Sequence, residues 1–156
     1  MSSRLPKTTA RERPENLAVL LREAFTALND QAVARLAERG HGVVRVAHGA
    51  VFQYLDDAGT TVTVLADRAG MTKQSMGELV RHLEAHGYVE RVPDPGDCRA
   101  KLVRATGRGG EVYAIVREFV VETEAHLTDR LGAARMRRLR DDLEAVRGAA
   151  AAMPRQ

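Results

Sequence analysis

The sequence has few of the residues that carry covalent or metal chemistry. Only one of its 156 residues is a cysteine, Cys98. A single cysteine excludes an intrachain disulfide and any zinc site that is built from several cysteines. No glycine-rich phosphate loop is present, Ser75 stands in no recognisable nucleophile elbow, and no motif places two carboxylates together. An enzyme is therefore the weakest of the functional classes that we consider, and no cofactor or metal is expected.

Long hydrophobic runs are also absent. No apolar run approaches the roughly 18 residues that a membrane span requires, and residues 1–13 are too polar for a secretory signal. We therefore expect a cytoplasmic protein with no membrane partner. The net charge of +3 and the pI of about 9.4 permit a nucleic-acid partner. Between Thr61 and Thr106, however, seven Lys and Arg residues stand against six Asp and Glu residues, so phosphate binding would depend on placement and not on bulk charge.

The N-terminal part begins with a polar, basic segment. Residues 1–13 contain four basic side chains without apolar periodicity, so this segment is either an arm that lies along DNA or a frayed tail. From Pro14, which suits a first helical turn, an apolar stripe predicts a helix over residues 14–40. Its members are Leu17, Leu20, Leu21, Ala24 and Leu28.

The middle of the chain, residues 41–106, predicts two short helices that meet at a tight turn, followed by a hairpin. Thr61 is suited to cap the first helix and Gly70 to end it, and Thr72 is suited to cap the second. The second helix covers residues 72–86, and its apolar residues recur at helical spacing at Met76, Leu79, Val80 and Leu83. The hairpin covers residues 88–105, with strands at 88–92 and 100–105 and a loop at 93–97.

The C-terminal part, residues 107–150, predicts two further amphipathic helices. Their apolar stripes comprise Val112, Ile115, Val116, Phe119, Thr123 and Leu127, and then Met136, Leu139, Leu143 and Val146. Together with residues 14–40 they carry more apolar surface than the small lobe of helices and hairpin can cover. Either a second copy of the chain buries this surface, or the three helices close over one another in a monomer.

Three segments resemble the multiple-antibiotic-resistance-regulator (MarR) family of bacterial transcription factors. They are residues 65–72, 83–91 and 93–103, and the most specific feature is an Asp-x-Arg motif, Asp97 and Arg99, after a Gly-Tyr-Val-Glu-Arg strand. The resemblance implies a mainly α (α+β) fold, namely a winged helix-turn-helix with a hairpin wing and long terminal helices that form a homodimer. It further implies a ligand-responsive repressor on a pseudo-palindromic operator. The rival interpretations are a winged-helix protein-interaction module with weak DNA affinity and, least favoured, a small-molecule enzyme.

The resemblance also implies which residues contact double-stranded DNA. The second helix of such a motif enters the major groove, and its outward residues here are Lys73, Gln74, Ser75, Gly77 and Arg81. In the wing, Arg99 is expected to reach the minor groove or its phosphates, with Asp97 as its brace and Arg91 and Lys101 beside it. Many relatives carry Ser-Arg where this chain has Gly77 and Glu78, and often a further arginine at Cys98. Glu78 could accept from a cytosine amine or pair with Arg81.

A ligand site is implied between the terminal helices and the DNA-binding lobe, where many relatives bind small aromatic or anionic compounds. Arg45, His48 and Phe52 are expected near this cleft; alternatively, Phe52 belongs to the core and Arg45 is solvated. His82 and His86 are four residues apart on one helix, a spacing that can bind a metal. Because no third ligand is identifiable, we expect a structural or solvent-facing role for both.

Overall fold

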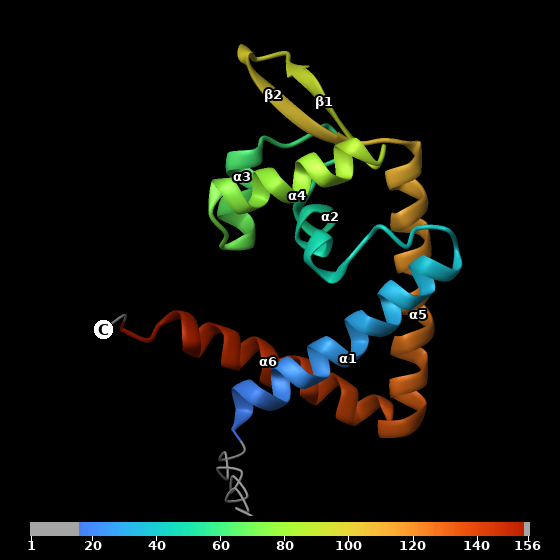
Figure 1. Cartoon of the computed structure of the whole chain (residues 1–156). Coiled ribbons are helices and arrows are strands. Elements are labelled where there is room, and N and C mark those ends of the chain that lie inside the picture. The colour runs from blue at the N-terminus through green and yellow to red at the C-terminus, as the bar shows by residue number, and fades with distance from the viewer. Residues whose placement is uncertain (1–15, 155–156) are drawn as a thin grey trace, which may run out of the picture.

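The computed structural model describes residues 16–154, apart from the side chain of Cys98. The segment that could be a basic arm, residues 1–13, and Pro14 lie outside the described residues. In chain order the structure contains α1 (Leu17–Glu38), the short 3-10 helix η1 (Val46–His48), α2 (Gly49–Tyr54), α3 (Val62–Ala69), α4 (Lys73–Ala85), β1 (Val89–Asp94), β2 (Asp97–Ala105), α5 (Gly107–Leu131) and α6 (Ala133–Ala151) (Figure 1). The predicted fold class, mainly helical with one hairpin, is confirmed.

The elements form two groups that α5 connects. Figure 1 shows α3, α4 and the hairpin at one end of the molecule, and α1, α6 and the C-terminal half of α5 at the other. A continuous core begins beneath α4, where Leu65, Met76, Val80, Leu83 and Val103 are fully buried. It extends along the first half of α5 through residues such as Val112 and Ile115. The core thus fixes α4 and the hairpin on the start of α5.

The turn between α3 and α4 forms as the sequence predicts. The Thr61 hydroxyl accepts a hydrogen bond from the Val64 N–H at 3.3 Å, and the Thr72 hydroxyl accepts one from the Ser75 N–H at 3.1 Å. Gly70 ends α3 with φ of 63°, in the left-handed region that glycine adopts without steric cost. These caps set the angle at which α4 leaves the turn.

The two strands of the hairpin are longer, and its loop is shorter, than the sequence predicts. Residues 93–97 are not a loop, since Pro93 and Asp94 pair within β1, Asp97 begins β2, and only Pro95 and Gly96 form the turn. Asp94 Oδ1 accepts a hydrogen bond from the Gly96 N–H at 2.8 Å. This side chain satisfies a turn backbone group that would otherwise be open, so both strands continue to the tip. A register shift between Pro93 and Asp94 accommodates the proline, and β1 lies at the edge of the sheet.

Much of the apolar surface of the terminal helices is open in the single chain. α1 starts at Leu17, where the Asn16 side chain accepts a hydrogen bond from the Val19 N–H, and the side chain of Leu17 is 54% exposed. Phe25 is 60% exposed and Val121 of α5 is 65% exposed. The stripe of α1 is therefore not covered by closure of the three helices on one another. None of the helices between residues 16 and 154 combines the length and the apolar character needed to cross a lipid bilayer.

Candidate nucleic-acid interface

Residues of α3, α4 and β1 line a notch of about 440 Å³ on the lobe that α2, α3, α4 and the hairpin form. Its lining consists of Val62, Lys73, Gln74, Gly77, Arg81 and Arg91. Five of these six are among the residues that the sequence predicts to contact DNA. On α4, positions 73, 77 and 81 are spaced by four and share one face of the helix. Val62 could not be recognised as a surface residue from the sequence, because an apolar side chain on a short helix is equally consistent with a place in the core.

The notch has a cationic rim. Among residues 16–154, neither Lys73 nor Arg81 forms an ion pair with a carboxylate. Glu78 forms no ion pair with a basic side chain of this part of the chain, so the predicted alternative of a pair with Arg81 is not formed. Arg91 Nε lies 3.4 Å from Glu84 Oε2 at the exposed edge of the lobe. Exposed pairs of this kind contribute little to stability. The positive charges of Lys73 and Arg81 are therefore available to an anionic partner.

The wing residues lie further out along β2. Asp97 Oδ1 accepts a hydrogen bond from the backbone N–H of Arg99 at 2.9 Å, so this carboxylate braces the backbone of Arg99. Residues 97, 99 and 101 alternate along one face of the strand, and all three are exposed. Ser75 is engaged at the start of α4, where its hydroxyl accepts a hydrogen bond from the Thr72 hydroxyl at 2.9 Å.

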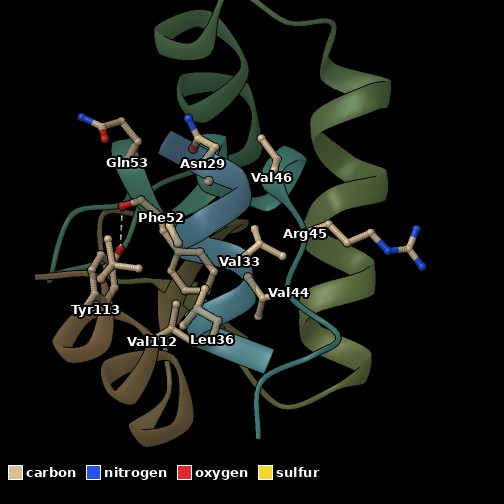
Figure 2. A pocket seen from close by; sticks show the side chains of 13 residues that line it. Asn29, Val33, Leu36, Val44, Arg45, Val46, Phe52, Gln53, Val112 and Tyr113 are labelled. Carbon is tan, nitrogen blue, oxygen red and sulfur yellow. Dashed lines mark hydrogen bonds between the residues drawn. The ribbon is translucent and has the colours of Figure 1, made fainter. Parts of the chain in front are cut away.

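A second cavity, of about 220 Å³, lies between α1, the segment from Val44 to Gln53, and α5. Figure 2 shows Val33, Val44, Phe52 and other apolar side chains around it, while the guanidinium of Arg45 points away from them. Arg45 is exposed, as in the interpretation that treats it as solvated. The lining combines Asn29, Ala32, Val33, Leu36, Val44, Arg45, Val46, Gly49, Phe52, Gln53, Val112, Tyr113 and Val116.

Tyr113 closes one side of this cavity. Its ring meets the ring of Phe52 edge-on at 5.3 Å, and its hydroxyl donates a hydrogen bond to the backbone oxygen of Phe52 at 2.8 Å. Burial, followed by the negative charges of Asp57 and Asp56, raises the pKa of Tyr113 to about 12. The tyrosine therefore remains a neutral donor at neutral pH and fixes α2 against α5.

His48 does not line the cavity, although the resemblance implies a place for it near the cleft with Arg45 and Phe52. It is 3% exposed, its Nδ1 accepts a hydrogen bond from the Arg45 N–H at 2.9 Å, and its ring stacks on His82 at 4.8 Å with an angle of 10°. Burial, followed by the charges of His82, Arg45 and His86, lowers the pKa of His48 to about 4. The neutral ring thus links η1 to the core-facing side of α4.

His82 and His86 belong to the same column of rings. Their centroids are 4.5 Å apart, and the His86 Nδ1–H donates to the backbone oxygen of His82 at 2.8 Å. Within the part of the chain that the structure describes, no group of three or more His, Cys, Asp or Glu residues is arranged to hold a metal ion. The third histidine comes from a distant segment, and no spacing in the sequence could reveal it.

Comparison with known families identifies the lobe that carries the notch. The model of the MarR family matches residues 41–100, which run from the end of α1 into β2. Residues 41–100 belong to the MarR family. Among curated protein sequences, none matches the chain.

The similarity of this chain to the MarR fold extends over most of its length. One similar structure is the S. aureus MepR–DNA complex, with a TM-score of 0.72 and 19% identity, covering 87% of this chain and 99% of that one. Wild-type MarR from E. coli in its apo form has a TM-score of 0.65 and 19% sequence identity, and the match covers 86% of this chain and 98% of that one. The transcriptional regulator Tm0710 from Thermotoga maritima has a TM-score of 0.55 and 28% sequence identity, and the match covers 85% of this chain and 92% of that one. The terminal helices thus belong to the MarR-type fold as well as the lobe.

Proposed function

We propose that this chain is a transcription regulator that binds double-stranded DNA with α4 in the major groove and the wing in the adjacent minor groove. The observation that carries the proposal is the notch, where α3, α4 and β1 bring Lys73, Arg81 and Arg91 around one concave surface. In DNA, one sugar-phosphate strand separates a major groove from the neighbouring minor groove. If helix and wing enter the two grooves, that strand must pass between them, along the notch. The S. aureus MepR–DNA complex has a similar fold.

The residues have different roles in this proposal. Lys73 contacts a phosphate or a guanine edge, Gln74 pairs with an adenine edge, and Arg81 and Arg91 contact phosphates. Arg99, held by Asp97, and Lys101 extend from the wing to the minor groove or its phosphates. Ser75 lies at the start of α4 and contributes through the cap that it shares with Thr72.

The regulator acts as a homodimer on a two-fold symmetric operator. The exposed apolar side chains of the terminal helices support this proposal, since a single chain leaves Leu17, Leu20, Leu21, Phe25, Leu28, Val120, Val121, Leu139 and Leu143 open to water. Two recognition helices related by a dyad enter successive major grooves about 10 base pairs apart, so the footprint should cover roughly 20 base pairs with inverted half-sites.

A small compound in the apolar cavity relieves repression. The cavity lies where α1 and α5 meet the segment that leads into the DNA-binding lobe, so an occupant would change how the lobe sits on the terminal helices. Because Arg45 points away and the lining is mainly aliphatic and aromatic, a neutral aromatic compound fits better than an anionic one. Bound to its operator, the dimer represses, and the occupied form dissociates.

Titrations of DNA across a salt series test the proposal and separate the two kinds of contact. The probe is the DNA that flanks the gene of this protein. Arg99→Ala should lower the magnitude of the log–log salt slope by about 2, one phosphate contact per wing. Gln74→Ala should cost about 1 to 3 kcal/mol per half-site at one symmetric pair of bases and leave the slope nearly unchanged. Arg117→Ala, which removes an exposed arginine of α5 outside the lobe, is the charge-matched control and should change neither quantity.

The outcomes distinguish the alternatives. Wild-type protein that binds DNA weakly and without a steep salt dependence would contradict the regulator and favour a protein-interaction module. If Arg99→Ala changed base preference while Gln74→Ala changed only the slope, the roles of wing and helix would be wrong. An asymmetric footprint without inverted half-sites would contradict the dimeric arrangement.

A further inference from the structure

Gly77 is a helical glycine that the fold does not require. A Cβ added at Gly77 would meet no atom within 4 Å, whereas a Cβ at Gly109 would lie 2.3 Å from the backbone oxygen of Tyr88. Gly77 stands in the middle of α4 and has no positive φ. Glycine in a helix interior is unfavourable relative to alanine because it loses more backbone freedom on folding. Glycine at position 77 therefore makes α4 less stable than alanine would, although the packing around α4 leaves room for the alanine methyl group.

The position of Gly77 suggests why a side chain is absent there, because Gly77 lies in the wall of the notch. Gly77 lines the notch between Lys73, one turn before it, and Arg81, one turn after it. These two side chains are separated by about 12 Å along the helix axis, with bare backbone between them. Val62 of α3 lines the same notch, and Arg91 of β1 adds a third cation. The notch therefore combines cations with an apolar floor made by Val62 and the Cα of Gly77.

A DNA strand offers a matching pattern. Along the strand that separates the grooves, charged phosphates alternate with deoxyribose rings, which are the less polar part of the backbone. We propose that Gly77 and Val62 form a seat for one deoxyribose ring, so that the phosphates on either side reach Lys73 and Arg81. The inference rests on the proposed DNA-binding function and deepens it. A methyl group at position 77 would occupy the floor of the seat and hold the strand away from the cations.

Gly77→Ala is the decisive variant because its effects on folding and on DNA binding should have opposite signs. Its melting temperature should rise by about 2 to 4 °C, as the helix gains a better helix former without a clash. Its affinity for DNA should fall at least about tenfold on the operator and on unrelated duplexes alike, since backbone contacts carry no sequence information. The salt slope should also become shallower, because fewer phosphates reach the cations.

Gly110→Ala is the matched control. Gly110 lies in the first turns of α5 and is exposed. A Cβ added at Gly110 would also meet no neighbouring atom within 4 Å. This variant should be at least as stable as the wild type and should bind DNA with unchanged affinity. Circular dichroism melts and fluorescence anisotropy titrations at two salt concentrations, on operator and unrelated duplexes, measure all of these quantities for full-length protein.

Each result decides the inference. Wild-type affinity in Gly77→Ala, or a melting temperature below that of the wild type, would overturn it. A loss confined to one base pair, with unrelated duplexes bound as before, would overturn the deoxyribose seat in favour of a contact with a base edge. In each of these cases the proposed DNA-binding function would still stand, provided that the wild-type protein binds DNA with a steep dependence on salt. If the wild type itself bound no DNA, the proposed function would fail together with the seat.

Discussion

Mild acid should destabilise this protein through one buried histidine, His48. Its pKa is lowered from 6.5 to about 4, because the ring is buried against α4 and lies near the charges of His82, Arg45 and His86. As the pH falls below about 6.5, the unfolded chain binds a proton at this position, whereas the folded protein does so only near pH 4. The stability that His48 contributes is therefore complete above pH 6.5 and is lost progressively between pH 6.5 and pH 4.

The size of the effect follows from the two pKa values. Between pH 7 and pH 5, the free energy of unfolding should fall by about 2 kcal/mol from this residue alone. For a chain of this length, that corresponds to a fall of about 4 to 8 °C in melting temperature. Arg68 and Arg35 hold the pKa values of the Asp56 and Glu122 carboxyls below the usual range. These carboxylates lose their contribution mainly below pH 5, because unfolded carboxyls have pKa values of about 4 and bind few protons between pH 7 and pH 5.

Urea unfolding at pH 7 and pH 5 measures the effect, with His48→Asn as the test variant. Asparagine keeps an acceptor near the position of Nδ1 for the Arg45 N–H but does not titrate. The variant should be less stable at pH 7, since the stack on His82 is lost, yet its further loss at pH 5 should be smaller than that of the wild type by about 2 kcal/mol.

His126→Asn is the control, because it removes an exposed histidine from α5. It should keep the wild-type dependence on pH. If His48→Asn lost as much stability between pH 7 and pH 5 as the wild type, His48 would not be the residue responsible, and the assignment of a buried neutral ring would be wrong.

Three further predictions concern packing and assembly. Gly109→Ala should lower the free energy of unfolding by about 3 kcal/mol in urea melts, because its Cβ would lie 2.3 Å from the Tyr88 oxygen; an unchanged midpoint would contradict this close approach. Tyr113→Phe should cost about 1 kcal/mol, since it removes the hydrogen bond to Phe52, and an equally stable variant would show that the bond contributes nothing. Sedimentation should show a dimer at micromolar concentration, and Phe25→Glu, at a 60% exposed side chain, should shift it to a folded monomer; a monomeric wild type would contradict the dimer.

Local features of the fold could be predicted from the sequence because each depends on a few neighbouring residues. Thr61, Gly70 and Thr72 are cap and turn residues whose hydrogen bonds span three positions, and the structure has all three in those roles. The strand ends were harder to predict. Proline and aspartate at 93–97 favour a loop, but the Asp94 side chain bonds to the turn backbone and the strands pair up to it.

The face of a helix could be predicted, but what covers it could not. Leu17 and Leu20 belong to an apolar stripe of α1 whose spacing is equally consistent with an intrachain core and with a surface for a second copy. In the single chain both side chains are about half exposed, and only that arrangement in space separates the two interpretations. The notch shows the same limit, because Val62 and Arg91 come from elements that no spacing relates to α4.

The segment from Arg45 to Gly49 shows most clearly why the proposed ligand site was only partly predictable. An irregular segment has no fixed period, so spacing gives no direction for its side chains. Within five residues, Val46 and Gly49 line the cavity, Arg45 extends away from it, and His48 stacks on His82 of α4. One short segment therefore forms both a wall of the cavity and a support of the helix that we propose reads DNA. A compound that displaced this wall would also displace the His48 ring, and α4 would lose the contact that links it to η1.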